Sequence, residues 1–95
     1  MKKAARRVNS GNIFLDLGFE PAEAAVLLMR SQLMIDITEY IAKKKLSQVE
    51  AARRLGVSQA RVSDLVRGKI EKFSLDMLVT LEERLGRHFE VRRAA

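Results

Sequence analysis

The segment from Leu46 to Lys69 constrains the fold most, because its residues predict two short helices joined by a tight turn. Ser47 and Glu50 have the spacing of a capping box, in which each side chain bonds the other residue's backbone amide at a helix start. Gly56 can take the left-handed backbone conformation in which such a helix ends. Ser58, two residues further on, is a favourable N-cap for the next helix. The chain is therefore expected to fold around two helices that meet at Gly56.

The apolar residues of this segment suit two helices that cross closely. Ala52 is small, as the first helix requires where the second passes above it, and Val62 and Leu65 form a wedge between the two. Val66 is expected to be buried with this wedge. Residues 47–68 thus have the pattern of a DNA-binding helix-turn-helix, whose second helix enters the major groove. An ordinary helical hairpin is the alternative, but the caps, the turn and the wedge agree over one continuous run and favour the helix-turn-helix.

The second helix of the motif has a polar face that suits base recognition. Gln59, in its first turn, can make a bidentate contact with adenine, and Ala60 can touch a thymine methyl group. Ser63 lies one turn further along and can reach a base or a phosphate. Arg61 and Arg67 flank this face, where phosphate contacts are expected, with a guanine contact as the alternative for Arg67. The face therefore predicts sequence-specific DNA binding.

Asp64 is the exception on this face, because DNA phosphates repel an acidic side chain. We expect Asp64 either to accept a hydrogen bond from a cytosine amino group or to orient Arg61 or Arg67. Gln48 begins the preceding helix and is placed to contact a phosphate beside that helix's N-terminus. The complete predicted DNA-binding set is Gln48, Ser58, Gln59, Ala60, Arg61, Ser63, Asp64, Arg67 and Lys69.

The net charge of +6 is concentrated around the motif. Residues 43–72 hold nine Lys and Arg against three Asp and Glu, whereas residues 1–42 and 73–95 are each balanced. Basic side chains at this position would neutralise DNA phosphates and release their counterions, which supplies most non-specific affinity. A merely solvated basic face is the alternative. RNA binding is a weaker one, because the chain has four Phe, one Tyr and no Trp and shows no stacking motif.

The sequence contains little that suits catalysis or metal binding. His88 is the only histidine, and no partner ligand lies near it in the sequence. The chain has neither a phosphate-binding glycine loop nor paired histidines at metal spacing, and it has no cysteine. We therefore expect a protein that is not an enzyme and has no metal or cofactor. The longest apolar run is interrupted by Arg30 and Asp36, and the N-terminus lacks an apolar signal core, so a cytoplasmic location is expected.

The chain before the motif divides into a tail and the start of one domain. Residues 1–10 are basic and are expected to be a flexible tail or an arm that reaches DNA, and residues 11–95 form a single domain. The alternation in residues 12–19 predicts a short strand. Pro21 suits the first position of a helix that runs to about Lys44. That helix is expected to be continuous or to divide at Ser31.

The chain after the motif predicts one more helix and a second strand. Ser74 is its expected N-cap and Gly86 its end, and the alternation in residues 88–92 predicts a short strand. This strand would pair with residues 12–17 or with its counterpart in a dimer. The last helix, with Leu81 and Leu85, and this strand are the expected dimer surface. The sequence therefore predicts an all-α fold of about five helices with short strands near both termini.

The run SQVEAARRLGVSQARVSDLVRGKIEKFSLDML resembles the Xre/Cro-type helix-turn-helix family, and with the upstream GNIFLDLGF it is similar to the HigA-type antitoxin branch. The resemblance covers about residues 10–91 and is most specific in ARVSDLVRGK. It implies a compact, lambda-repressor-like all-α domain that acts as a dimeric transcriptional repressor on a palindromic operator. By position, it implies the DNA-contacting residues Gln48, Ser58, Gln59, Ala60, Arg61, Ser63 and Arg67.

The resemblance further implies a second activity, the neutralisation of a small basic ribonuclease toxin of the HigB/RelE type encoded beside the protein. In such a type II toxin–antitoxin pair the antitoxin also represses the shared promoter. Residues 10–42 hold one basic residue against five acidic ones, which suits a basic partner, with Ile13 to Phe19 as an apolar anchor. An ordinary acidic surface beside a core strand is the alternative for that patch. For the whole protein, the alternative is a phage-type or Xre-family regulator with no toxin partner.

Overall fold

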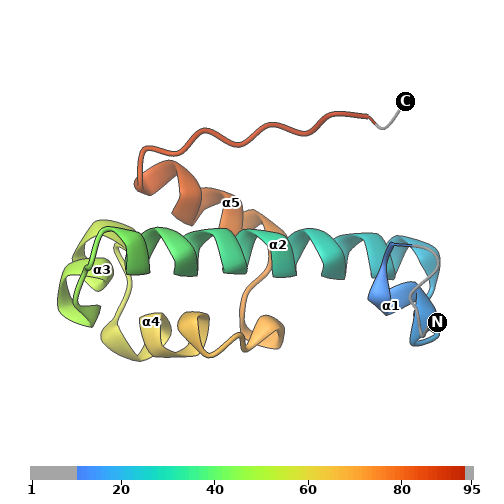
Figure 1. The fold of residues 1–95 in the computed structure, drawn as a ribbon, viewed down its shortest axis with the longest axis horizontal. Helices are drawn as coiled ribbons and strands as arrows, with labels where there is room; N and C mark the ends of the chain where they lie inside the picture. Colours follow the sequence, from blue (N-terminus) through green and yellow to red (C-terminus); the bar gives the residue numbers. More distant parts are fainter. Residues whose placement is uncertain (1–10, 94–95) are drawn as a thin grey trace.

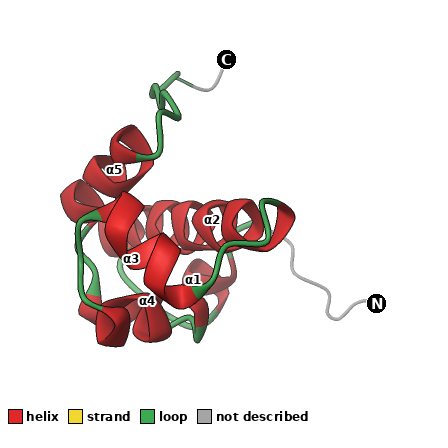
Figure 2. Ribbon diagram, turned by 90° about the vertical axis from the view of Figure 1, so that its left-hand side faces the viewer, coloured by secondary structure: helices red, strands yellow, loops and turns green. Residues whose placement is uncertain are grey.

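The computed structural model describes residues 11–93, and that part of the chain is helical without any strand. The elements are α1 (Ile13–Asp16), α2 (Pro21–Lys43), α3 (Gln48–Leu55), α4 (Gln59–Val66), the 3₁₀-helix η1 (Ile70–Lys72) and α5 (Leu75–Arg84). The long α2 is the axis of the molecule, with α5 on one side of it and α4 on the other (Figure 1). The end-on view in Figure 2 shows the same three layers. The prediction of an all-α fold with five helices is confirmed.

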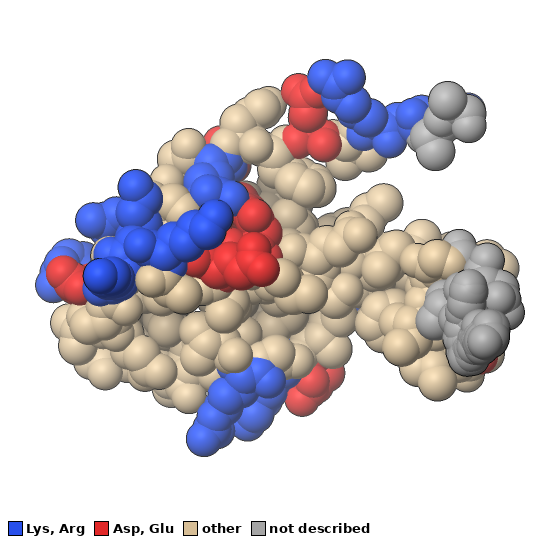
Figure 3. Space-filling view, viewed as in Figure 1, with Lys and Arg blue, Asp and Glu red and all other residues tan. Residues whose placement is uncertain are grey.

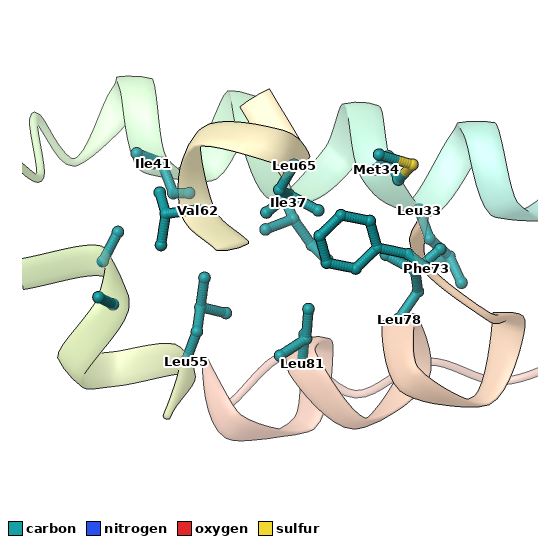
Figure 4. Close-up of a cluster of buried hydrophobic side chains, with 12 residues drawn as sticks. Leu33, Met34, Ile37, Ile41, Leu55, Val62, Leu65, Phe73, Leu78 and Leu81 are labelled. Atoms are coloured by element: carbon teal, nitrogen blue, oxygen red, sulfur yellow. The ribbon is translucent and has the colours of Figure 1, made fainter. Parts of the chain in front are cut away.

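The hydrophobic core lies between α2 and the elements that follow it (Figure 4). The wedge residues Val62 and Leu65 are 0% and 1% exposed, and Phe73 is 1% exposed, so the predicted packing of α4 is confirmed. Val66 is a correction, since 37% of it is exposed. It follows Leu65 by one residue, and the rotation of the helix turns it away from the wedge toward a groove beside Ile35 of α2.

Helix α2 begins at Pro21 as predicted, and the Glu20 side chain accepts a hydrogen bond from the backbone N–H of Glu23. Of the two alternatives for this helix, the continuous one is confirmed and the division at Ser31 is wrong, because α2 runs unbroken for 23 residues. The Ser31 hydroxyl donates to the Leu28 carbonyl at 2.8 Å, which satisfies this polar side chain within the helix. Arg30 does not interrupt the core either, because its guanidinium reaches sideways to later backbone carbonyls.

The strand predicted in residues 12–19 is also wrong, since residues 13–16 form the one-turn helix α1. The Asn12 side chain accepts hydrogen bonds from the backbone N–H groups of Phe14 and Leu15, which stabilises a helical turn in place of an extended chain. Its amide also donates to the Ala24 carbonyl at 3.1 Å. This bond holds α1 against the first half of α2.

The strand predicted in residues 88–92 is not formed, because no strand lies beside it in the described chain. Residues 12–17 are helical and offer no edge to pair with. The segment after α5 instead runs away from the helices (Figures 1 and 2). Phe89 packs against the core, whereas Val91 is 73% exposed. The predictions for the basic tail of residues 1–10 lie outside the described residues.

Two further findings concern the molecule as a whole. Leu81, an expected dimer residue, is only 1% exposed and belongs to the core of a single copy, while Leu85 is half-buried. Leu81 therefore cannot contribute much surface to a second subunit.

No helix within residues 11–93 has both the length and the apolar character needed to cross a membrane.

Candidate nucleic-acid interface

The first helix of the motif, α3, is fixed by the predicted capping box. The Glu50 N–H donates to Ser47 Oγ at 3.1 Å, and the Ser47 N–H donates to Glu50 Oε1 at 3.0 Å. The Ser47 N–H and, at 3.2 Å, the Ser47 hydroxyl both donate to Oε1 of Glu50, which holds the pKa of the Glu50 carboxyl below its ordinary value. Gln48, the first residue of α3, is exposed beside this helix start. Its backbone and side chain are therefore accessible at the positive end of the helix.

The turn between the two helices depends on Gly56, whose φ of +71° is in the left-handed region. Its N–H donates to the Ala52 carbonyl at 2.8 Å, as predicted for a helix end. Arg84 of α5 donates to the Leu55 carbonyl at 2.8 Å, and a Cβ at Gly56 would lie 3.2 Å from the Arg84 guanidinium. The turn is therefore restricted both by its backbone conformation and by the approach of α5.

Both ends of the second helix, α4, are capped by local hydrogen bonds. The Arg61 N–H donates to Ser58 Oγ at 3.1 Å, so the hydroxyl of Ser58 acts as the predicted N-cap. At the other end Gly68 has a φ of +73°, and the Lys69 N–H donates to the Asp64 carbonyl at 3.0 Å. This is the hydrogen bond of a Schellman motif. This bond ends α4 and fixes the position of Lys69 directly after the helix.

Four of the predicted base-reading residues share one side of α4. Gln59, Ala60 and Arg67 are exposed and Ser63 is half-buried, while Val62 and Leu65 point the opposite way into the core. Within residues 11–93, the side chains of Gln59 and Arg67 have no hydrogen-bond or ion-pair partner. The structure therefore brings together a polar surface whose amide and guanidinium groups are available to a ligand.

Arg61 was expected to contact phosphate, but the structure gives it an internal position. Its guanidinium lies 4.2 Å from the centre of the Phe73 ring, and its Nη1 donates to the Lys72 carbonyl at 3.0 Å. Arg30 of α2 reaches the same segment, where its Nε donates to the Phe73 carbonyl at 2.8 Å. Two arginines from different helices thus hold the loop that follows α4.

Asp64 orients neither Arg61 nor Arg67. Its carboxylate instead lies 3.6 Å from the ammonium of Lys69 and 3.8 Å from that of Lys72. Lys72 was missing from the predicted set. The sequence pattern that could have identified Lys72 is its spacing of three residues from Lys69, because side chains three residues apart align on a 3₁₀-helix such as η1.

The charged side chains are unevenly distributed over the surface. Figure 3 shows Lys and Arg gathered over the end of the molecule that holds α3 and also below α4. On the same face, the visible part of α1 and the first half of α2 carries no basic side chain. The basic excess of residues 43–72 therefore lies on α3, on α4 and on the segments directly before and after them.

His88 is a surface residue, with 77% of its side chain exposed and its ring nitrogens 3.4 Å from Glu83 and 3.6 Å from Glu90. Within residues 11–93, no group of three or more His, Cys, Asp or Glu is arranged to hold a metal ion.

A capped pair of crossing helices, with a polar side of the second helix exposed between basic residues, defines a DNA-binding helix-turn-helix domain. A family model described as "Helix-turn-helix domain" matches residues 13–93. The chain belongs to this family. Comparison with curated proteins finds no match.

Proposed function

We propose that the protein is a sequence-specific transcriptional repressor that binds a palindromic operator as a two-fold dimer. The observation that carries this proposal is the exposed side of α4, where Gln59 and Arg67 have no partner among the described residues. An α-helix with its side chains is about 10–12 Å in diameter and fits a major groove that is about 12 Å wide, and the eight residues of α4 form about two turns within it. Gln59 then faces an adenine and Ala60 a thymine methyl group.

The remaining members of the site position α4 on the duplex. Gln48, at the start of α3, and Ser58, at the start of α4, present helix N-termini to phosphates, and Lys69 and Arg67 supply positive charge. One such domain reads only a few base pairs. A dimer reads two half-sites about 34 Å apart, which is one turn of the duplex.

The proposal is tested by binding of labelled duplex from the protein's own promoter beside a scrambled duplex, at several salt concentrations. Gln59→Ala is expected to lower affinity for the promoter about 10-fold, the effect of one lost bidentate base contact, and to leave the scrambled duplex unaffected. Gln32→Ala is the matched control, because Gln32 is an exposed glutamine on α2, outside the motif. Equal affinity of the wild type for both duplexes would reduce the interaction to electrostatics and overturn sequence-specific repression.

A second function, that of the antitoxin in a type II pair, is favoured by the end of the molecule formed by α1 and the first half of α2. Large apolar side chains are exposed there: Ile13, Leu15, Leu17, Phe19, Val26 and Met29. Leu17 is 68% exposed, and an exposed apolar group of this extent is typical of a protein-binding surface. The acidic residues of this end are Asp16, Glu20 and Glu23.

Charge further favours a basic partner for this surface. Arg30 is the only basic residue between positions 11 and 42, and its guanidinium is engaged by the carbonyls of Ile70 and Phe73. Among the described residues 11–42, this surface therefore presents apolar and acidic groups without a competing free cation, which suits a small basic ribonuclease of the HigB/RelE type. A regulator of the phage or Xre type that acts without a toxin is the alternative.

Pull-down of the purified product of the neighbouring gene distinguishes these two possibilities. Leu17→Glu is expected to lower capture at least 10-fold and to leave promoter binding intact, because Leu17 lies at the end of the molecule remote from α4. Val49→Glu, which places the same charge at a half-exposed valine on α3, is the control that should retain capture. If the wild-type protein captures nothing, the stand-alone regulator is favoured. If Leu17→Glu still captures the product, this surface is not the docking site.

A further inference from the structure

Three charged side chains form an ion-pair group at the end of α4. The two oxygens of Asp64 face different lysines, with Oδ1 3.6 Å from Lys69 Nζ and Oδ2 3.8 Å from Lys72 Nζ. The side chains of the lysines are 39% and 48% exposed, and that of Asp64 is 19% exposed. The carboxylate is thus the inner member, and both ammonium groups remain accessible from solvent.

The backbone of this group is held in place. Lys69 is tied to Asp64 itself by the bond from its N–H to the Asp64 carbonyl. Lys72 is tied to α4 by the bond from Arg61 to its carbonyl, and its own N–H donates to the Lys69 carbonyl at 3.0 Å. The lysines therefore stay within reach of Asp64 because the loop that carries them cannot swing away.

We propose that Asp64 is an internal competitor for DNA phosphate, and that it sets the strength with which the domain binds DNA of any sequence. This inference rests on the proposed DNA-binding function. Lys69 and Lys72 are the cations that continue the basic surface beyond Arg67, and their phosphate contacts would supply non-specific affinity. Asp64 pairs with both ammonium groups before DNA arrives, so each lysine must release the carboxylate before it can bind a phosphate. Exposed ion pairs of this kind contribute little to stability, so a phosphate can replace the carboxylate.

The size of the effect follows from the dependence of DNA binding on salt. Release of the two lysines from one carboxylate charge allows about one further phosphate to be neutralised, which steepens the slope of log K against log salt by about 0.9. At 0.15 M salt this corresponds to about fivefold tighter binding. The gain should be the same for promoter and scrambled duplex, because no base contact changes.

The experiment measures binding of Asp64→Asn to both duplexes between about 0.05 and 0.3 M salt, a range in which the Debye length falls from about 14 Å to about 6 Å. Glu83→Gln is the control of equal net charge, since the Glu83 side chain is 56% exposed on α5, on the other side of α2. We expect the fivefold gain and the steeper slope only for Asp64→Asn. The gain should disappear when Lys69→Gln and Lys72→Gln are combined with it.

The other outcomes overturn the proposal in distinguishable ways. Weaker binding of Asp64→Asn to both duplexes would make Asp64 a positioning residue for the lysines, and weaker binding to the promoter alone would make it a reader of a base. If Asp64→Asn still binds DNA more tightly when both lysines are replaced, the gain comes from the net charge of the protein and not from competition for the lysines. If the wild type binds neither duplex, the proposed function fails, and elution from heparin, a polyanion without sequence, decides the remaining question. Later elution of Asp64→Asn than of Glu83→Gln supports the internal competitor, and equal elution contradicts it.

Discussion

At the residue scale, Glu82 shows the largest effect of the fold on a single side chain. It is the one charged residue that is buried among those described, with 2% exposed, on the side of α5 that packs against α2. Arg87 donates from Nε to Glu82 at 3.2 Å and from Nη2 to both oxygens of Asp36 at 2.8 and 2.9 Å. Burial and the neighbouring Asp36 raise the pKa of Glu82 to about 7, whereas hydrogen bonds from Glu82 and Arg87 lower the pKa of Asp36.

This arrangement predicts a pH dependence of stability. The folded protein binds a proton at Glu82 more tightly than the unfolded chain does, whose carboxyl has a pKa of 4.5. The resulting stabilisation is complete below pH 4.5 and is lost as the pH rises through about 7. The lowered pKa of Asp36 acts in the opposite direction, but only below its ordinary value of 3.8, outside this window. We therefore expect the free energy of unfolding to fall by about 2 kcal/mol between pH 5 and pH 8.

Glu82→Gln tests this prediction, because the amide can still accept from Arg87 and donate to Asp36 but does not titrate. Its free energy of unfolding, measured by urea denaturation, should be nearly constant between pH 5 and pH 8 and at least equal to that of the wild type at pH 8. Glu83→Gln, at an exposed neighbour, should keep the wild-type pH dependence. A wild-type profile that is flat over this range would show that Glu82 is already ionised in the folded protein.

Arg61 illustrates what sequence could not determine at this scale. Its place on α4 predicts exposure toward DNA, and the helix does bring it near that surface. Its partners, the Phe73 ring and the Lys72 carbonyl, belong to a loop whose path depends on the complete fold. The same is true of Asp64, whose partners follow α4 in the sequence but approach it only because the chain turns at Gly68.

At the element scale, helix boundaries followed from the sequence where their hydrogen bonds are local. Ser47, Ser58 and Ser74 each cap a helix by bonding an N–H three residues further on, so a window of four residues contains the whole interaction. The helix ends at Gly56 and Gly68 are equally local, since each requires only a left-handed residue. The motif of α3, turn and α4 could therefore be predicted with its boundaries.

The two strand predictions failed because the alternation extended over too few residues. A pattern of four to six residues suits one turn of helix as well as a strand. For α1 the choice is decided by Asn12, which bonds both its own helix start and Ala24, twelve residues away. For residues 88–92 the extended shape is present, but a strand needs a neighbour, and no described part of this copy supplies one.

At the scale of the whole molecule, α2 separates two surfaces of different chemistry. The molecule measures 42 × 26 × 22 Å, and α2 lies along its long dimension (Figure 1). One end presents α3 and α4 with the basic residues, and the other presents the apolar and acidic surface of α1. The division of charge along the chain was visible in the sequence. The distance between the two surfaces was not, because it depends on α2 being one unbroken helix. If both proposed functions hold, a single copy can bind DNA and a protein partner at the same time.

We propose the segment after α5 as the contact surface of the dimer that is predicted from the need for two half-sites. Residues 87–93 are extended and leave the body of the molecule, with Phe89 anchored on the core and Val91 73% exposed. Such a segment has unpaired N–H and C=O groups that a second copy can satisfy in a two-fold antiparallel pair. Leu81 cannot serve this role, because it is buried within one copy.

Val91→Pro tests this interface, because proline removes a backbone donor and does not fit within a paired strand. The variant should be monomeric by light scattering at about 10 μM, where a dimer with a micromolar dissociation constant is mostly formed. Its helical circular dichroism should stay at the wild-type level, since Val91 lies outside the helices of residues 11–93. Its affinity for the complete promoter should fall to about that of a single half-site. Val91→Thr, which retains the N–H and a β-branched side chain, should remain a dimer. If Val91→Pro also remains a dimer, the subunits meet elsewhere, and the apolar groove between α2 and α4 beside Ile35 and Val66 becomes the next surface to mutate.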